Sequence, residues 1–231
     1  VTSDQGNQKI RELGIPVVVL GIGQNTTDTL LKEFKMIGHI LGTEKEATEL
    51  IDYWGKKLEL IKQKTTSVPE DKKKRVFYTS SGLPFRTDGK LWWGHYFIET
   101  AGGINVSREL GSSGEITPEQ LLLWNPDFII TSINKNNRSS TDEIRKNLKI
   151  KNVKAIKNNA VYPCPIGAFW WDRPSPEAIL GIIWLPGVLY PDLMTDIDLE
   201  TETIHFFKQF YKYDLSKQEY NVFFNTGKIR E

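Results

Sequence analysis

Cysteine and histidine are scarce in this chain, and their scarcity excludes several kinds of site. The single cysteine, Cys164, cannot form an internal disulfide, and it lacks the cysteine and histidine neighbours of a zinc site. We expect it to be a small buried apolar residue. Among the three histidines, His95 has a possible co-ligand in Glu99, four residues further on. Two ligands are too few for a metal ion in a protein, so we predict no metal site.

The chain also lacks an excess of one charge and any long apolar run. Thirty Lys and Arg residues against 29 Asp and Glu residues leave a formal net charge of +1. This balance argues against a nucleic-acid partner, because such proteins carry a basic stripe. No apolar run approaches the roughly 20 residues of a transmembrane helix. The first 20 residues lack the basic start, apolar stretch and cleavage site of a signal peptide.

No catalytic set of residues is recognisable. Gly21-Ile22-Gly23 follows a predicted strand, but position 26 is a threonine where a dinucleotide-binding loop needs its third glycine. No serine or cysteine stands with a histidine and a carboxylate in a spacing typical of a nucleophilic site. No carboxylate lies in a sequence context that would shift its pKa. We therefore expect no catalytic residues.

Aromatic residues, by contrast, are abundant. Four of the seven tryptophans form two doublets, Trp92-Trp93 and Trp170-Trp171. Neighbouring side chains point to different sides of a strand or a helix. We therefore expect at most one member of each doublet to line a site, with the other in the core.

The stretch 160–191 combines its aromatic run with the pair Asp172-Arg173 and then an apolar helix. Aromatic faces supply contact area and a guanidinium supplies direction, which suits a wall that grips a bulky or anionic ligand. The alternative is a loop whose rings only fill the core. Residue types alone leave both readings open.

Helix-like and strand-like segments alternate along the chain, which predicts an α/β fold with a mostly parallel sheet. We expect helices over residues 1–13, 28–41, 43–65, 91–101, 117–124, 141–148, 176–190 and 200–224. We expect strands over residues 17–20, 75–79, 104–106, 128–130, 153–156 and 161–162. The run 17–20 is continuously apolar, which is typical of a strand buried on both faces. Helix 43–65, with a capping box of Thr43 and Glu46, would span roughly 33 Å and could join two lobes.

Several segments carry a resemblance to a known family. The segments are GIPVVVL (14–20), ETAGGINVS (99–107), EITPEQLLLWNPDFII (115–130), AVYPCPIGAFWWDRPSPE (160–177) and WLPGVLYPDLMTDIDL (184–199). With them, the chain resembles the substrate-binding proteins of ABC importers for iron-siderophores, haem and cobalamin, from about residue 10 to the C-terminus. The tail, residues 190–216, resembles members thought to handle oxyanions such as molybdate.

The resemblance implies a class III substrate-binding protein, in which one long rigid helix links two α/β lobes and the ligand is clamped in the cleft between them. In those terms, residues 1–42 are a remnant of the N-terminal lobe, residues 43–66 are the connecting helix, and residues 67–231 are a complete, three-layered C-terminal lobe. The family normally has a longer segment before residue 15, which holds a lipoprotein signal and half of the cleft. We therefore expect a chain that lacks most of its N-terminal lobe and binds ligand weakly.

The resemblance also implies site residues. The loop after Ile166 would turn Trp170 or Trp171, together with Arg173, toward the ligand. The facing wall of the same lobe would hold Arg86, Trp92, Trp93, His95 and Tyr96. In the family an acidic residue of each lobe docks an arginine of the permease. The matching position here is Asp172, with Glu177 as the second choice.

The function implied is that of an extracytoplasmic binding protein, lipid-anchored when full-length, which is not an enzyme and needs no cofactor. It would deliver a metal chelate (ferric siderophore, haem or cobalamin) to a membrane permease. The first alternative is capture of molybdate or tungstate by Arg86, Arg173 and backbone N–H groups. The second alternative is an enzyme or a cofactor-assembly protein on a similar fold, and the lack of a catalytic set of residues argues against it. An interaction role for an isolated lobe is a third, and self-association is expected only through the incomplete lobe, whose sheet edge and cleft face would be uncovered.

Overall fold

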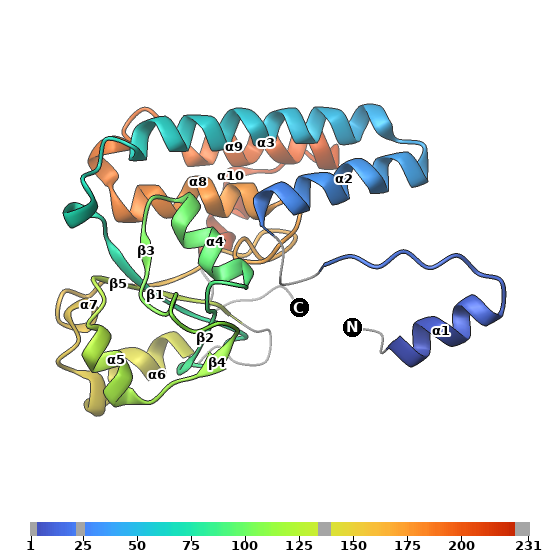
Figure 1. The fold of residues 1–231 in the computed structure, drawn as a ribbon. Coiled ribbons are helices and arrows are strands. Elements are labelled where there is room, and N and C mark those ends of the chain that lie inside the picture. The colour runs from blue at the N-terminus through green and yellow to red at the C-terminus, as the bar shows by residue number, and fades with distance from the viewer. Residues whose placement is uncertain (1–3, 22–25, 134–139, 225–231) are drawn as a thin grey trace.

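A computed structural model describes residues 4–21, 26–133 and 140–224. At its centre lies a four-stranded parallel sheet with the order β3-β1-β5-β6 (Figure 1). The strands are β1 (Arg75–Thr79), β3 (Ile104–Asn105), β5 (Phe128–Thr131) and β6 (Val161–Pro163). Strands β1 and β5 pair from Val76 opposite Phe128 to Thr79 opposite Thr131. The predicted α/β class with a parallel sheet is confirmed.

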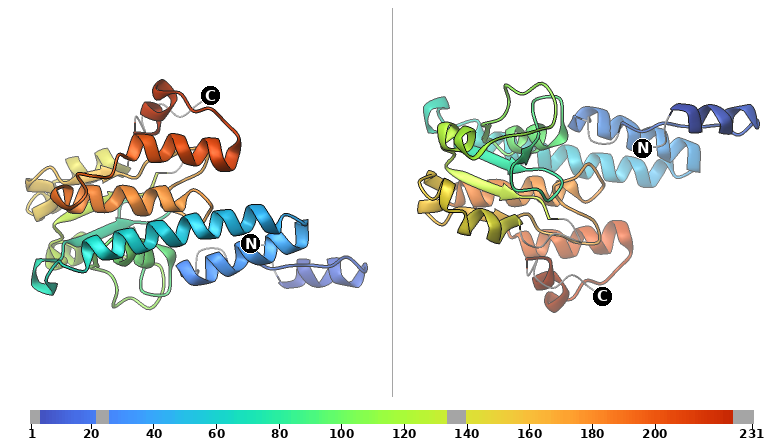
Figure 2. Two further views of the ribbon diagram at one scale, coloured as in Figure 1. Left: turned by 90° about the horizontal axis from the view of Figure 1, so that it is seen from above. Right: turned by 90° about the horizontal axis from the view of Figure 1, so that it is seen from below.

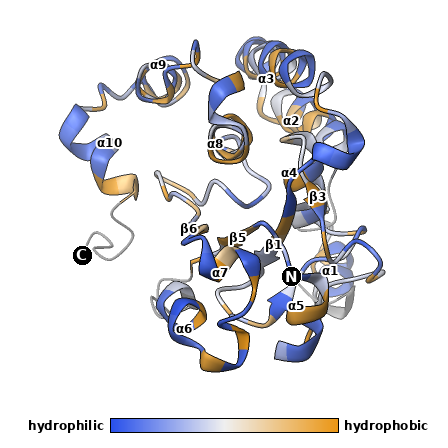
Figure 3. Ribbon diagram, turned by 90° about the vertical axis from the view of Figure 1, so that its left-hand side faces the viewer, coloured by the Kyte–Doolittle hydropathy of each residue, from blue (hydrophilic) through white to orange (hydrophobic). Residues whose placement is uncertain are grey.

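Helices cover both faces of this sheet, which makes three layers (Figure 3). Val76 and Tyr78 of β1 pack with the helices of one face, and Phe77 between them packs with the other face. The first face is covered by α3 (Glu44–Thr65), α4 (Trp93–Thr100), α8 (Ala178–Leu189) and α9 (Leu199–Tyr211), and the second by α5 (Pro118–Trp124), α6 (Ser140–Lys146) and α7 (Lys154–Lys157). Because alternate residues of a strand point to opposite faces, one short strand contributes to both cores.

Helix α8, with the sequence AILGIIWLPGVL, is apolar all round and contacts α3, α4 and α9. A helix without a polar face must be buried on every side, so α8 occupies the middle of its layer. A Cβ atom added to Gly181 would lie 2.3 Å from the carbonyl oxygen of Trp171, closer than two such atoms can approach. Glycine is therefore required where the loop before α8 crosses it.

The long helix α3 runs beside α2 (Thr27–Leu41), and α1 (Asp4–Glu12) projects beyond both (Figure 2). Thr26 caps α2 through a capping box with Thr29, and Gly42 ends that helix in the left-handed conformation. The fully buried Trp54 joins α3 to the next layer, because its indole N–H donates to the carbonyl oxygen of Pro176 at 3.2 Å. Helix α3 matches the prediction for 43–65, but Thr43 makes no side-chain cap, so the predicted capping box with Glu46 is wrong.

The run 17–20 is not a strand in the structure. Residues 15–20 form no regular secondary structure, no strand of the described residues pairs with them, and Val19 is 63% exposed. A parallel strand is stabilised by the ladder bonds of its neighbours, and without a neighbour the apolar pattern alone does not form one.

Residues 153–156 are also not a strand, since they begin α7. The first N–H groups of a short helix need acceptors, and the Asn125 side chain accepts from Lys154 N at 2.8 Å while the Pro126 carbonyl accepts from Ala155 N at 3.0 Å. Both acceptors come from the turn after α5, which the sequence of 153–156 does not contain.

The remaining elements are short. The C-terminal helical region is divided into α9 and α10 (Lys217–Phe224), because Lys212 adopts a left-handed conformation with φ +53°. Strands β2 (Arg86–Thr87) and β4 (Gly114–Glu115) form an unpredicted antiparallel pair. The described residues also include the 3₁₀ turns η1 (Glu70–Lys72), η2 (Leu148–Ile150) and η3 (Pro191–Leu193). Within the described residues, every helix is either too short or too polar to cross a bilayer.

The close approach at Gly181 predicts an effect on stability. Overpacking a tight site costs about 1–3 kcal/mol, so we expect Gly181→Ala to lower the free energy of unfolding by about 2 kcal/mol in urea titrations. Gly187→Ala on the same helix is the control, because an added Cβ meets nothing within 4 Å there. A similar loss in both variants would contradict the close contact with the loop.

Candidate functional site

The carboxyl ends of β1, β5 and β6 meet at one edge of the sheet, because these strands are parallel neighbours. In open α/β sheets, ligands bind outside the carboxyl ends of the strands. Buried hydroxyl side chains gather at this edge, namely Thr79, Ser80, Thr131 and Ser132. The Thr79 hydroxyl accepts from the backbone N–H of Ser132 at 3.1 Å, which leaves its own proton available to donate. This edge is the candidate site.

Residues 164–177, here called the aromatic loop, follow β6 at the same edge. The indole N–H of Trp170 donates to the carbonyl oxygen of Ile133, just after β5, at 2.6 Å. The Arg173 guanidinium carbon lies 4.2 Å from the centre of the Trp170 ring. Within the described part of the chain, Arg173 makes no ion pair with a carboxylate. The loop therefore holds a positive charge on a fixed aromatic platform.

In each tryptophan doublet one member is buried in the core and the other is partly exposed, as expected. Trp171 is 0% exposed and packs edge-on against Phe223 and Phe224 of α10, at 6.1 and 5.9 Å between ring centroids. Trp93 is 2% exposed, whereas Trp92 and Trp170 are partly exposed. Trp93 and Trp171 were predicted to line the ligand, and the structure corrects this because both are core residues.

The predicted facing wall is arranged around α4. Trp92 stands directly before this helix, and His95 and Tyr96 are partly exposed in its first turns, with their rings 5.3 Å apart. Burial lowers the pKa of His95, so the imidazole is neutral at pH 7. Arg86 lies on β2, is partly exposed, and makes no ion pair with a described carboxylate.

Tyr78 connects α4 to the aromatic loop. Its ring packs edge-on against Phe97 of α4 at 6.3 Å. Its hydroxyl donates to Asp172 Oδ2 at 3.1 Å. Asp88 lies near enough to Tyr78 to raise its pKa, and it accepts from the backbone N–H of Gly94 at 3.2 Å. A tyrosine and two carboxyls thus interact between α4 and the aromatic loop.

Asp172 and Glu177 do not reach the surface. Asp172 is 2% exposed and Glu177 is 0% exposed. Glu177 accepts from the backbone N–H of Phe169 and from the indole N–H of Trp171, each at 3.0 Å. Both carboxyls were predicted to dock a permease, and the structure contradicts this because their oxygens face their own loop and core.

Burial also shifts the pKa of the carboxyls near the site. Loss of hydration raises the pKa of Asp172, although the Ser132 hydroxyl and the Arg173 charge lower it in part. Burial raises the pKa of Asp88 and that of Glu177, the latter to about 7. The expectation that no carboxylate has a shifted pKa is therefore wrong.

Sequence reasoning missed four residues of this edge, which are Tyr78, Ser80, Asp88 and Ser132. Ser80 could have been found, because it directly follows the predicted strand 75–79 and so lies at its carboxyl end. Tyr78 and Asp88 are recognisable only from contacts across the fold. Among the residues described, no group of three His, Cys, Asp or Glu side chains is placed to hold a metal ion.

Comparison with known proteins decides the family. A model described as periplasmic binding protein matches residues 3–166. The chain belongs to this family. Periplasmic binding proteins carry ligands and are not enzymes, in agreement with the expectation from the sequence.

Two curated relatives of this periplasmic binding protein are informative. The molybdate-binding protein MolA of Haemophilus influenzae is 26% identical over 187 residues, 80% of this chain and 52% of the relative. The uncharacterized ABC transporter substrate-binding lipoprotein YvrC of Bacillus subtilis is 25% identical over 186 residues, 80% of this chain and 57% of the relative. The chain thus spans about half the length of the curated relatives it matches.

Solved structures share the fold. A periplasmic solute-binding protein from Veillonella parvula superposes with a TM-score of 0.79 at 29% identity, covering 95% of this chain and 67% of the other. MolA of Haemophilus influenzae bound to molybdate superposes with a TM-score of 0.81 at 22% identity, covering 93% and 71%. At that identity the second match shows the fold alone.

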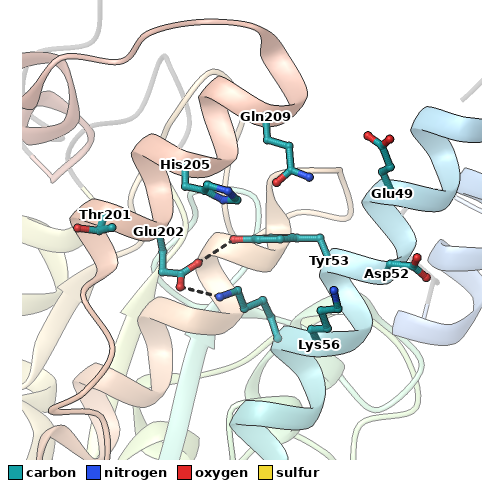
Figure 4. A pocket seen from close by; sticks show the side chains of 9 residues that line it. Glu49, Asp52, Tyr53, Lys56, Thr201, Glu202, His205 and Gln209 are labelled. Atoms are coloured by element: carbon teal, nitrogen blue, oxygen red, sulfur yellow. Dashed lines mark hydrogen bonds and ion pairs between the residues drawn. The ribbon is translucent and has the colours of Figure 1, made fainter.

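A polar pocket of about 540 Å³ lies elsewhere on this periplasmic binding protein, between α3 and α9 (Figure 4). Lys57 Nζ lies 2.6 Å from Glu202 Oε1, and the Tyr53 hydroxyl donates to Glu202 Oε2 at 3.2 Å. The His205 ring stacks on Tyr53 at 6.2 Å. Because its central charges already pair with each other, we interpret this pocket as the contact that holds α9 against α3.

This contact predicts a stability difference. Removing one partner of a mostly buried ion pair leaves the other charge uncompensated. We expect Lys57→Met to lower the free energy of unfolding by about 1–3 kcal/mol in urea titrations. Lys208→Met is the control on α9, because its ion pair with Asp214 is exposed, and we expect no measurable change. Equal effects of the two variants would contradict the assignment.

Proposed function

We propose that the protein is the substrate-binding component of an ABC importer, which captures a small ligand outside the cytoplasm and delivers it to a membrane permease. Membership of the periplasmic binding protein family supports the capture step. YvrC, a relative at 25% identity, is named as an ABC transporter substrate-binding lipoprotein, which supports the extracytoplasmic location and the permease partner. In the whole protein, α3 would be the helix between two lobes, with α2 on one side and residues 67–231 on the other.

The ligand we propose is a tetrahedral oxyanion such as molybdate. The main support for this choice is the Arg173 guanidinium, which stacks on Trp170 and makes no ion pair with a described carboxylate. The sheet edge beside the aromatic loop is also rich in hydroxyl side chains. Charged and neutral donors on a fixed frame are what an oxyanion needs, because each of its oxygens accepts hydrogen bonds. MolA, the relative at 26% identity, is named as a molybdate-binding protein.

A metal chelate is the second candidate, and one feature favours it. An apolar pocket of about 630 Å³ adjoins the aromatic loop, and Phe169 lines it together with Phe34 and Tyr211. An apolar wall beside an arginine suits a chelate with aromatic arms and carboxylates. The core positions of Trp93 and Trp171 leave less exposed ring area than the sequence predicts, which is why we rank the chelate second.

Calorimetric titration with sodium molybdate, a ferric catecholate, haem and cobalamin separates these proposals. We expect saturable binding of molybdate, weakened about 10- to 100-fold by Arg173→Ala, because a charge-assisted hydrogen bond contributes about 1.5–3 kcal/mol. Arg108→Ala is the matched control, since Arg108 is half-exposed and pairs with Glu109.

The other outcomes are equally informative. Saturation by the ferric catecholate, haem or cobalamin, without molybdate, would replace the oxyanion with the chelate. Equal loss in the Arg173 and Arg108 variants would place the ligand outside the aromatic loop. A flat response to all four probes that persists in a longer chain with both lobes would contradict the capture of these ligands.

A further inference from the structure

The carboxylate of Glu177 lies inside the aromatic loop, where it meets several donors and, among the described residues, forms no ion pair with a cation. Its Oε1 accepts from the backbone N–H of Phe169, and its Oε2 accepts from the indole N–H of Trp171. The Tyr211 hydroxyl of α9 and the backbone N–H of Ala168 also act as donors to it. Burying a carboxylate is costly unless hydrogen bonds compensate its lost hydration. Here most of that compensation comes from one short loop.

The backbone of the loop touches the carboxylate directly. A Cβ atom at Gly167 would lie 2.1 Å from Glu177 Oε2 and 2.9 Å from Trp171 Nε1. The Trp171 carbonyl also lies directly against Gly181 of α8. The loop therefore contacts both the Glu177 carboxylate and the backbone of α8.

The ligand-facing residues lie within this fixed segment. Trp170 stands between Phe169 and Trp171, both of which donate to Glu177. Arg173, two residues beyond Trp171, stacks on the Trp170 ring. The direction of the Arg173 guanidinium thus depends on a backbone that Glu177 holds.

We propose that Glu177 is the positioning residue of the ligand site, whose carboxylate holds the aromatic loop so that Trp170 and Arg173 face the ligand. This inference rests on the proposed function. It assigns Glu177 a role that differs from surface docking and from chemistry, because its oxygens contact the loop and not the ligand.

Because Glu177 can lose its charge, this role predicts that ligand affinity depends on pH. Loss of hydration raises its pKa to about 7, although the Trp171 and Tyr211 donors oppose the shift. Tyr211, the titratable side chain that faces it from α9, stays protonated because burial and the Glu177 charge raise its own pKa. Below pH 7 the carboxylate gains a proton and becomes a weaker acceptor for the loop donors. Ligand affinity should therefore rise with pH through 7.

Stability should move in the opposite direction. The pKa of Glu177 in the folded protein lies above its ordinary value of 4.5, so the folded state binds this proton more tightly than the unfolded state. Its contribution to the free energy of unfolding is then largest at low pH and falls as pH rises from about 4.5 to about 7. A residue that served stability alone would not make binding stronger where folding becomes weaker.

The first test observes the loop without ligand. In protein labelled with ¹⁵N at the tryptophan indoles, we expect the Trp171 N–H signal, assigned with Trp171→Phe, to titrate with a midpoint near pH 7. The titration should vanish in Glu177→Gln and persist in Gly187→Ala. If Glu177→Gln fails to fold, Tyr211→Phe provides a second test of the same titration. Loss of that donor should move the midpoint upward, because a donor to the charged form lowers an acid's pKa.

The second test measures binding of sodium molybdate by calorimetry at pH 6 and pH 8. If only the ionised form of Glu177 is competent, a pKa near 7 makes the affinity of the wild-type protein about tenfold higher at pH 8. The affinity of Glu177→Gln should be weak and independent of pH, and that of Gly187→Ala should follow the wild type. A Trp171 signal that does not titrate, or a titration that survives Glu177→Gln, would overturn the proposal.

Two further outcomes separate this inference from the proposed function. Loss of the indole titration in Glu177→Gln with unchanged molybdate affinity would overturn the positioning role alone. The wild-type protein could also bind no molybdate while its Trp171 signal still titrates with Glu177. This result would contradict the oxyanion ligand but would support the contact between Glu177 and the loop. The ferric catecholate then replaces molybdate as the probe in the same pair of pH values.

Discussion

The all-round burial of helix α8 is the constraint on which the rest of the structure depends. A helix with no polar face needs an apolar partner on every side. The sheet and its loops cover one side, and α3, α4 and α9 cover the others. Because the aromatic loop crosses α8 at Gly181, this same burial decides how the loop leaves β6. The core and the candidate site are therefore parts of one packing arrangement.

Charge is distributed unevenly around the candidate site. Arg173 and Arg86 are partly exposed and make no ion pairs with described carboxylates. The nearby acids Asp88, Asp172 and Glu177 lie below the surface, where burial raises their pKa. A buried acid that is partly neutral competes weakly for an arginine. Under the proposed function, this arrangement makes the guanidinium groups available to an anionic ligand.

Much of the fold could be predicted from the sequence, because its signals are local. The strands 75–79 and 128–130 and the helix 43–65 follow from apolar patterns within each segment. The segments 17–20 and 153–156 could not be predicted, because a strand also needs a neighbour and the α7 start depends on acceptors from Asn125 and Pro126. The same apolar sequence is compatible with several secondary structures, and the neighbouring segment of the fold decides between them.

The candidate site divides in the same way. The doublet rule correctly predicted that one tryptophan of each pair is a core residue. That Trp170 and Arg173 contact the ligand stays a prediction from an aromatic run beside an arginine. The burial of Asp172 and Glu177 could not be predicted, because a carboxylate near the start of a helix is usually solvated. Their partners Tyr78 and Tyr211 come from distant parts of the chain.

The hydrogen bond from Trp54 to Pro176 has a mechanical consequence. Trp54 lies near the middle of the 22-residue helix α3, and Pro176 directly precedes Glu177. The backbone at the end of the aromatic loop is thus hydrogen-bonded to α3, the longest of the described helices. If α3 joins two lobes as proposed, a change in its tilt would act on Pro176 through this hydrogen bond. The hydrogen bond would then couple the movement of the lobes to the position of the aromatic loop.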